Sequence, residues 1–236
     1  MALTRRLKNM LPYLNLPGLR NAFGLLSSEE RQQWIRSAGF APLDQISPDK
    51  TYPWYTFRSI EYLEHIIRPD MKVLEYGSGY STLWWARRVA EVTSVERSKV
   101  WCDGLEKAIK KNNFKNVRLV HFDKFTQEIN DSLCESKKPD EVPSVVNQYV
   151  LAANPSPAQY DVVIVDDVYR NVTSALALEF IKPGGVLILD DSERKWYQPT
   201  IEALDRQRWS FASFYGATPY HFVEKQTTIW FKPTAL

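Results

Sequence analysis

The sequence predicts an α/β protein with a Rossmann-like, doubly wound sheet that is mostly parallel and has an antiparallel last strand. Two observations predict it. Short apolar runs that end in carboxylates alternate with helical segments along the chain, as in parallel sheets joined by helices. The last two strand-like runs, 209–215 and 227–231, have only a loop with Gly216, Pro219 and His221 between them, so they should pair antiparallel.

The N-terminal part predicts a helical extension over residues 1–52, followed by one domain over residues 53–236. A Ser-Ser-Glu-Glu start at residues 27–30 and a stop at Gly39 indicate a helix, and residues 42–53 read as a linker. Residues 54–67 place apolar side chains at helical spacing and end before Pro69, which predicts a helix that leads into the first strand.

The first strand runs directly into a sharp turn. Residues 73–76 are apolar around Glu75, and Gly77 and Gly79 follow, where glycine allows positive φ and a close approach of a ligand to the backbone. Ser81 or Thr82 is expected to cap the next helix. A strand that turns into a helix through glycines is typical of sites for nucleotide-like cofactors.

The rest of the chain continues the alternation. Further strands are expected at 92–96, 117–123, 160–167 and 184–191, and further helices at 99–112, 142–152, 172–181 and 199–206. Each of these strands ends in an acid, so carboxylates should gather at one edge of a parallel sheet. The segment at about 124–159 is long and polar in its middle, which indicates an insertion with a surface loop.

Composition limits the function classes. With 44% apolar residues, 25% charged residues and a net charge of +2, the chain should bury one core, and it lacks the bulk positive charge typical of nucleic-acid binders. Cys102 and Cys134 form no metal or disulfide pattern, which favours a cytoplasmic protein. No apolar stretch is long enough for a membrane span. The basic residues 1–26 leave open a helix that packs on the domain or on a partner subunit, as in a homodimer, or a weak contact with a membrane surface.

Residues 75–82 read EYGSGYST and resemble the class I S-adenosylmethionine-dependent methyltransferases, in the variant with the pattern E-x-G-x-G-x-S-T. The resemblance covers about residues 53–232. It implies a seventh strand inserted antiparallel between the fifth and the sixth, and S-adenosylmethionine as cofactor. A nucleotide-dependent oxidoreductase or sugar-modifying Rossmann enzyme is the alternative, and Glu75, Ser81 and the final strand pair speak against it. A non-catalytic cofactor-binding subunit is a second alternative, but the acids that would bind the cofactor are all present.

The resemblance also implies cofactor residues. Glu75 and Gly77 would face the methionine end, together with Tyr76, Ser78, Gly79 and Ser81. Glu96, about twenty residues further on, would hold the ribose hydroxyls. Asp123, Lys124 and Phe125 would lie beside the adenine.

The acceptor is expected beyond the fourth and fifth strands. Asp166 would face both the methyl group and the acceptor, and Asp191 would contact the acceptor. His221 is a candidate base because imidazole titrates near neutrality. Arg170, Arg194 and Tyr197 would complete a polar pocket for the acceptor. Trp54 and Tyr55 begin the helix that covers the cofactor in this family, so they would form a lid, with aromatic core packing as the alternative. Related metal-dependent O-methyltransferases hold Mg²⁺ with acids after these strands, so a metal at Asp166, Asp190 and Asp191 is the alternative. Arg170, Arg194 and Lys195 would make it unnecessary.

Together these features predict methyl transfer to a hydroxyl, with an amine as the second choice, of a small-molecule acceptor. The sequence carries no motif that identifies the acceptor.

Overall fold

The computed structural model describes residues 51–125, 144–220 and 224–234. The predicted N-terminal extension therefore lies almost entirely outside the described residues, as do His221, Cys134 and the middle of the predicted insertion. In the described part, no helix combines the length and the apolar character that crossing a membrane requires.

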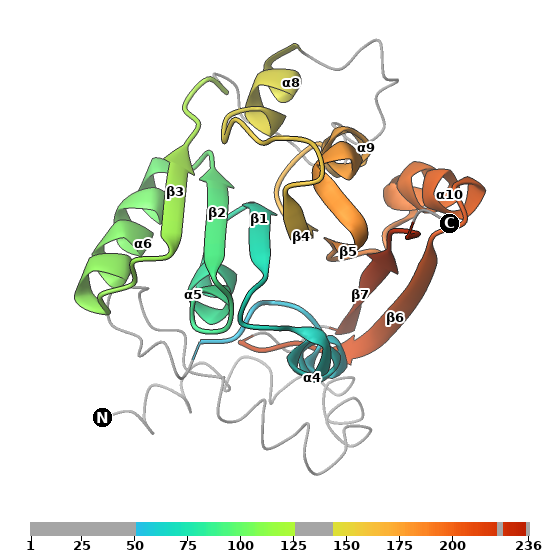
Figure 1. The fold of residues 1–236 in the computed structure, drawn as a ribbon, viewed down its shortest axis with the longest axis horizontal. Coiled ribbons are helices and arrows are strands. Elements are labelled where there is room, and N and C mark those ends of the chain that lie inside the picture. The colour runs from blue at the N-terminus through green and yellow to red at the C-terminus, as the bar shows by residue number, and fades with distance from the viewer. Residues whose placement is uncertain (1–50, 126–143, 221–223, 235–236) are drawn as a thin grey trace, which may run out of the picture.

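A seven-stranded sheet forms the centre of the domain, in the order β3-β2-β1-β4-β5-β7-β6 (Figure 1). The first five strands in this order, from β3 through β2, β1 and β4 to β5, pair in parallel. Strand β7 pairs antiparallel with both β5 and β6. This order confirms the predicted fold, including the strand inserted between the fifth and the sixth. The strand bounds are β1 Lys72–Tyr76, β2 Glu91–Glu96, β3 Val117–His121, β4 Tyr160–Val165, β5 Ile181–Leu189, β6 Ser210–Ala217 and β7 Glu224–Phe231.

Helices cover both faces of the sheet. The described helices are α4 Phe57–Ile66, α5 Tyr80–Ala86, α6 Lys99–Lys111, α8 Ser144–Val150, α9 Arg170–Ala177 and α10 Gln198–Arg206, with 3₁₀ turns η3 Leu178–Phe180 and η4 Lys195–Tyr197. Successive residues of β4 alternate between two cores, because side chains of a strand point to opposite faces. Val163 and Val165 pack with side chains of α8, α9 and α10, whereas Val162 and Ile164 pack with those of α4 and α5. The chain is therefore doubly wound.

Most predicted elements are present, and their ends differ from prediction for local reasons. Helix α4 begins at Phe57 rather than at residue 54, because the side chain of Thr56 accepts a hydrogen bond from Ser59 N and caps the helix. Helix α5 begins at Tyr80, so the N-cap residue is Gly79, but Thr82 Oγ1 accepts a hydrogen bond from Gly79 N at 3.0 Å and so contributes to the cap as predicted. Strand β5 begins at Ile181 rather than at the predicted residue 184, and its first residues pair irregularly with β4.

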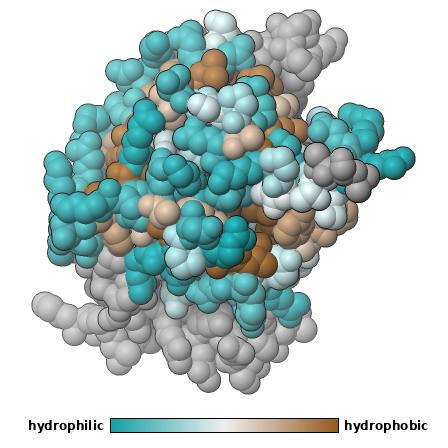
Figure 2. Space-filling model, viewed as in Figure 1, coloured by the Kyte–Doolittle hydropathy of each residue, from teal (hydrophilic) through white to brown (hydrophobic). Residues whose placement is uncertain are grey.

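The surface seen in Figure 2 is mostly hydrophilic, with smaller apolar patches between the polar side chains. The carboxyl ends of β1, β2, β4 and β5 bring the predicted acids to one edge of the sheet, where β7 runs in the opposite direction.

Candidate functional site

Backbone hydrogen bonds hold the turn after β1 between β2 and the end of β4. Gly77 N donates to Val95 O at 2.9 Å, and Asp166 N donates to Tyr76 O at 2.9 Å. Gly77 has φ +92°, and a Cβ atom at this position would lie 2.6 Å from the backbone oxygen of Asp166. Glycine is required here for two reasons, the left-handed conformation and the close approach of the β4 backbone.

Glu75 lies below the turn and is fully buried. Its Oε2 atom accepts hydrogen bonds from Thr82 Oγ1 at 2.5 Å and from Ser94 Oγ at 2.7 Å. Its Oε1 atom has no hydrogen-bond partner among the described residues. Burial raises the pKa of Glu75 to about 7, although the hydroxyls of Ser81, Thr82 and Ser94 lower it. The carboxyl group therefore ties the strands to helix α5 and changes its protonation near neutral pH.

This shift makes stability depend on pH. Between about pH 4.5 and 7 the folded chain keeps the Glu75 proton that the unfolded chain has lost, so the free energy of unfolding should fall as pH rises. Glu75 alone accounts for about 3 kcal/mol of this fall. Glu75→Gln should remove that part, as measured by urea unfolding at pH 5 and pH 7.5. An equal fall in the variant would contradict the assignment.

Glu96 ends β2 and fixes the loops on either side of it. Its Oε2 atom accepts hydrogen bonds from Ser78 N at 2.8 Å and Ser78 Oγ at 3.1 Å, and its Oε1 atom accepts one from Ser98 N at 2.6 Å. Burial, and then the charge of Asp167, raise the pKa of Glu96. The carboxylate thus connects the glycine turn to the start of α6.

One cavity of about 520 Å³ runs from the glycine turn to the ends of β4, β5 and β7. It brings together many of the residues predicted for the site: Trp54, Gly77, Ser78, Gly79, Ser81, Glu96, Asp166, Arg170, Asp191 and Arg194. Asp167, which was expected to end the fourth strand beside Asp166, lines it too, and the sequence did not point to several others: Tyr80, Arg97, Ser98, Trp101, Thr218 and Lys225. Residues from both halves of the sequence therefore line the same cavity.

Other predicted residues do not line this cavity: Tyr55, Glu75, Tyr76, Asp123, Lys124, Phe125 and Tyr197. The Tyr76 hydroxyl donates to Val150 O at 2.8 Å, on the opposite face from α5. Tyr197 is buried, 5.4 Å below the guanidinium of Arg170. Tyr55 is buried in the core cluster that contains side chains of α4 and α5.

The residues predicted for the adenine lie apart from the cavity. Asp123 is exposed, and Lys124 Nζ donates to Gln148 Oε1 at 3.0 Å. The ring of Phe125 stacks on that of Tyr169 at 6.3 Å. The place of His221 is outside the described residues, so its predicted role as a base stays a prediction.

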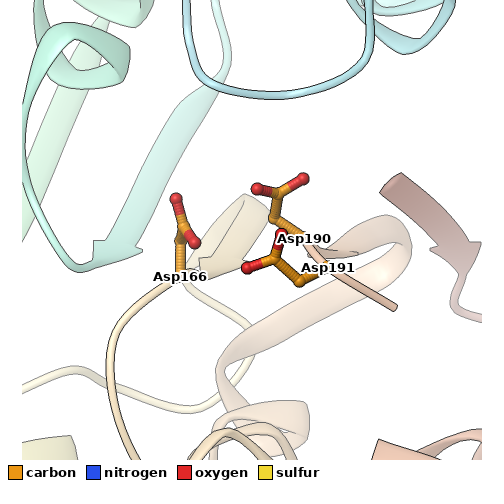
Figure 3. Close-up of side chains that lie close together, drawn as sticks. All are labelled: Asp166, Asp190 and Asp191. Atoms are coloured by element: carbon orange, nitrogen blue, oxygen red, sulfur yellow. The ribbon is translucent and has the colours of Figure 1, made fainter. Parts of the chain in front are cut away.

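Asp166, Asp190 and Asp191 form an acidic cluster at the other end of the cavity (Figure 3). Their side chains leave the ends of β4 and β5, and each can offer an oxygen within 4.8 Å of the others. Asp191 has φ +56°, a backbone conformation that is costly for a residue with a side chain.

Three cations surround these acids. Arg170 Nη2 lies 2.9 Å from Asp166 Oδ1, Arg194 Nη2 lies 2.8 Å from Asp191 Oδ2, and Lys225 Nζ lies 3.2 Å from Asp191 Oδ1. Lys225 also pairs with Asp190. Lys195, expected in this role, is exposed and forms no ion pair within the described part of the chain, so that prediction was wrong.

The cations act unequally on the three acids. Burial raises the pKa of Asp190 to about 7 despite Lys225, and it raises the pKa of Asp166 despite Arg170. Burial would also raise the pKa of Asp191, but Lys225, Arg170 and Arg194 together bring it below its usual range. The cluster therefore contains one firmly ionised acid and two that accept a proton more readily.

The comparisons with known proteins concern the fold and the segment with the glycine turn. The family model of the protein-L-isoaspartate(D-aspartate) O-methyltransferases matches residues 45–126, which contain the glycine turn and strands β1 to β3. An O-methyltransferase from Bacillus cereus, solved in complex with S-adenosylhomocysteine, superposes with a TM-score of 0.56 and 16% identity over 98% of this chain and 100% of that one. The protein has the class I methyltransferase fold.

Two further structures share this fold. A methyltransferase from Pyrococcus furiosus has a TM-score of 0.50 and 17% identity over 98% of each chain. An S-adenosylmethionine-dependent O-methyltransferase from Thermotoga maritima has a TM-score of 0.51 and 12% identity over 84% of this chain and 73% of that one. A search of curated protein sequences finds no match. The predicted resemblance to class I methyltransferases is thus confirmed for the fold and, through the family model, for the segment with the glycine turn.

Proposed function

We propose that the protein transfers a methyl group from S-adenosylmethionine to a hydroxyl group of a small-molecule acceptor. The observation that carries the proposal is the single cavity, which joins the glycine turn and Glu96 at one end to the acid and cation cluster at the other. One half has the groups that suit a nucleoside cofactor, and the other half has groups that can bind and deprotonate an acceptor. The cofactor supplies a methyl group that is already activated by the positive sulfonium.

The residues of the first half fit this cofactor. Gly79 lines the cavity, and a Cβ atom there would meet only a ring atom of Trp101, at 3.9 Å, which leaves room for a ligand beside the backbone. Glu96 is at the end of β2, where a carboxylate can accept the two hydroxyls of a ribose. Buried Glu75 does not line the cavity but holds the glycine turn from below through Thr82 and Ser94.

In the second half, Asp166 is best suited to accept the proton of the acceptor. It lines the cavity, its side chain is partly exposed, and burial raises the pKa of its carboxyl group. A base whose pKa is closer to the working pH takes up a proton more effectively. Asp191 stays ionised and can accept a hydrogen bond from the acceptor, while Arg194 and Lys225 offer donors.

The comparisons do not identify the acceptor. The family model ends at residue 126, before strands β4, β5 and β7 that form this half of the cavity. The acceptor in the name of that family, protein isoaspartate, is therefore not transferred to this chain.

A labelled-methyl assay tests the proposal. We expect label from S-adenosylmethionine to appear in hydroxylated small molecules and not in the matching amines. Asp166→Asn should lower turnover by about 100-fold or more, because a positioned base contributes that much, while the affinity for S-adenosylhomocysteine should change little. Asp205→Asn, an exposed acid on α10, is the matched control. Label in the amines alone, or full turnover in Asp166→Asn, would contradict the proposal.

A further inference from the structure

We propose that the ammonium group of Lys225 takes the place of a divalent cation among Asp166, Asp190 and Asp191, so that the acceptor half of the cavity works without a metal. The inference rests on the proposed function, which assigns this half of the cavity to the acceptor. It concerns a residue that the sequence alone did not point to.

The acidic cluster has the chemistry of a metal site. Three carboxylates from two neighbouring strand ends can offer oxygens within 4.8 Å of one another, and hard oxygen ligands suit Mg²⁺ or Mn²⁺. The residues around it do not fit an ion, because Lys225 pairs with both Asp190 and Asp191. Arg170 pairs with Asp166 and lies 3.4 Å from Asp191. An ion would have to displace these cations.

The position of Lys225 is fixed by the sheet. It lies on β7, two residues before Thr227, so both side chains point to the same face of the strand. Thr227 Oγ1 donates to Asp190 Oδ1 at 2.7 Å, while Lys225 contacts the other oxygen of the same carboxylate. Thr227 Oγ1 also accepts a hydrogen bond from Thr56 N, at the start of α4. Both oxygens of Asp190 are therefore held by side chains of β7, and Thr227 is itself held by the residue that caps α4.

Because both side chains are buried, a metal ion should not readily displace Lys225 from the two acids. The side chain of Asp190 is fully buried and that of Lys225 is 11% exposed. Removing one member of such a pair leaves an uncompensated charge, so the pair should persist in the folded protein. Because Lys225 also lines the cavity, it presents a fixed positive charge beside Asp191. We assign it as a positioning residue that holds the acids and orients the acceptor oxygen.

Titration with Mn²⁺, followed by the loss of the free-ion signal in electron paramagnetic resonance, tests the inference on the full chain. The wild type should show no saturable binding tighter than about 1 mM. Lys225→Ala should bind one Mn²⁺ about tenfold or more tightly than the wild type, because it releases the oxygens of Asp190 and Asp191 that Lys225 now contacts. Lys225→Arg keeps the charge and should behave like the wild type, as should Lys195→Ala, which removes one exposed positive charge.

The outcomes are distinct. Saturable Mn²⁺ binding by the wild type that is lost in Asp191→Asn would overturn the inference, and so would a folded Lys225→Ala that binds no more Mn²⁺ than the wild type. If Lys225→Ala does not fold, Lys225→Gln, which keeps a hydrogen-bond donor toward Asp190, takes its place. The titration of the wild type tests whether the cluster binds Mn²⁺ even if neither Lys225 variant folds. A thermal shift with S-adenosylhomocysteine in the same samples reports on the cofactor site, so failure of the proposed function is seen separately.

Discussion

Gly77→Ala should destabilise the protein by about 3 kcal/mol or more, because it combines an unfavourable backbone conformation with a steric clash. The residue has φ +92°, and the new methyl group would lie 2.6 Å from Asp166 O and 3.1 Å from Asp167 Cβ. The clash is with backbone, so strands β1 and β4 would have to separate. Urea unfolding measures the change, and the affinity for the cofactor should fall with it.

Gly79→Ala is the matched control for this prediction. Gly79 has φ 171°, an extended conformation that any residue adopts, and the atom nearest to its added Cβ is 3.9 Å away. We expect a loss of less than about 1 kcal/mol of unfolding free energy. Equal destabilisation by the two substitutions would show that the turn is not constrained at Gly77 in the way described.

Glu96→Ala should have the largest effect on cofactor binding. The substitution removes a carboxylate that is expected to accept two ribose hydroxyls, and it also releases Ser78 N and Ser98 N, which the carboxylate now holds. Loss of charge-assisted hydrogen bonds of this kind should weaken binding by about 1.5 to 3 kcal/mol. Calorimetric titration with S-adenosylhomocysteine measures the change.

Glu106→Ala is the control for Glu96→Ala, since it removes an exposed acid on the outer face of α6. It should leave the affinity unchanged. If Glu96→Ala folds normally and binds the cofactor as tightly as the wild type, the ribose contact must lie elsewhere.

The strands could be predicted because their signals are local, whereas the insertion of β7 between β5 and β6 followed from the resemblance to the methyltransferase family. Each strand of the parallel part is an apolar run that ends in an acid, and the absence of a helix between 215 and 227 was enough to predict an antiparallel pair. Gly77 could be singled out for the same reason, since a glycine directly after a buried strand indicates a sharp turn. The reason it must be glycine, the backbone oxygen of Asp166, lies 89 residues further along the chain and could not be seen from sequence.

The charge balance of the acidic cluster could not be predicted from proximity in sequence. Lys195 follows Asp191 closely but is exposed, whereas Lys225 is 34 residues away and reaches the cluster because β7 runs antiparallel beside β5. The register pairs Leu189 with Thr228, so continuing the ladder places Thr227 and its neighbours beside Asp190 and Asp191. Predicting that register in addition to the strand order would have pointed to Lys225. The pairing of Asp167 with Arg97 and Tyr149 likewise joins three elements that no sequence motif connects.

Calorimetric titration of the wild-type protein with S-adenosylhomocysteine, beside an identical titration with NAD, tests the central claim most directly. We predict one saturable site for S-adenosylhomocysteine and no binding of NAD, because the glycine turn is followed by Ser81 and is held from below by buried Glu75. Saturable binding of NAD with none of S-adenosylhomocysteine would contradict the account.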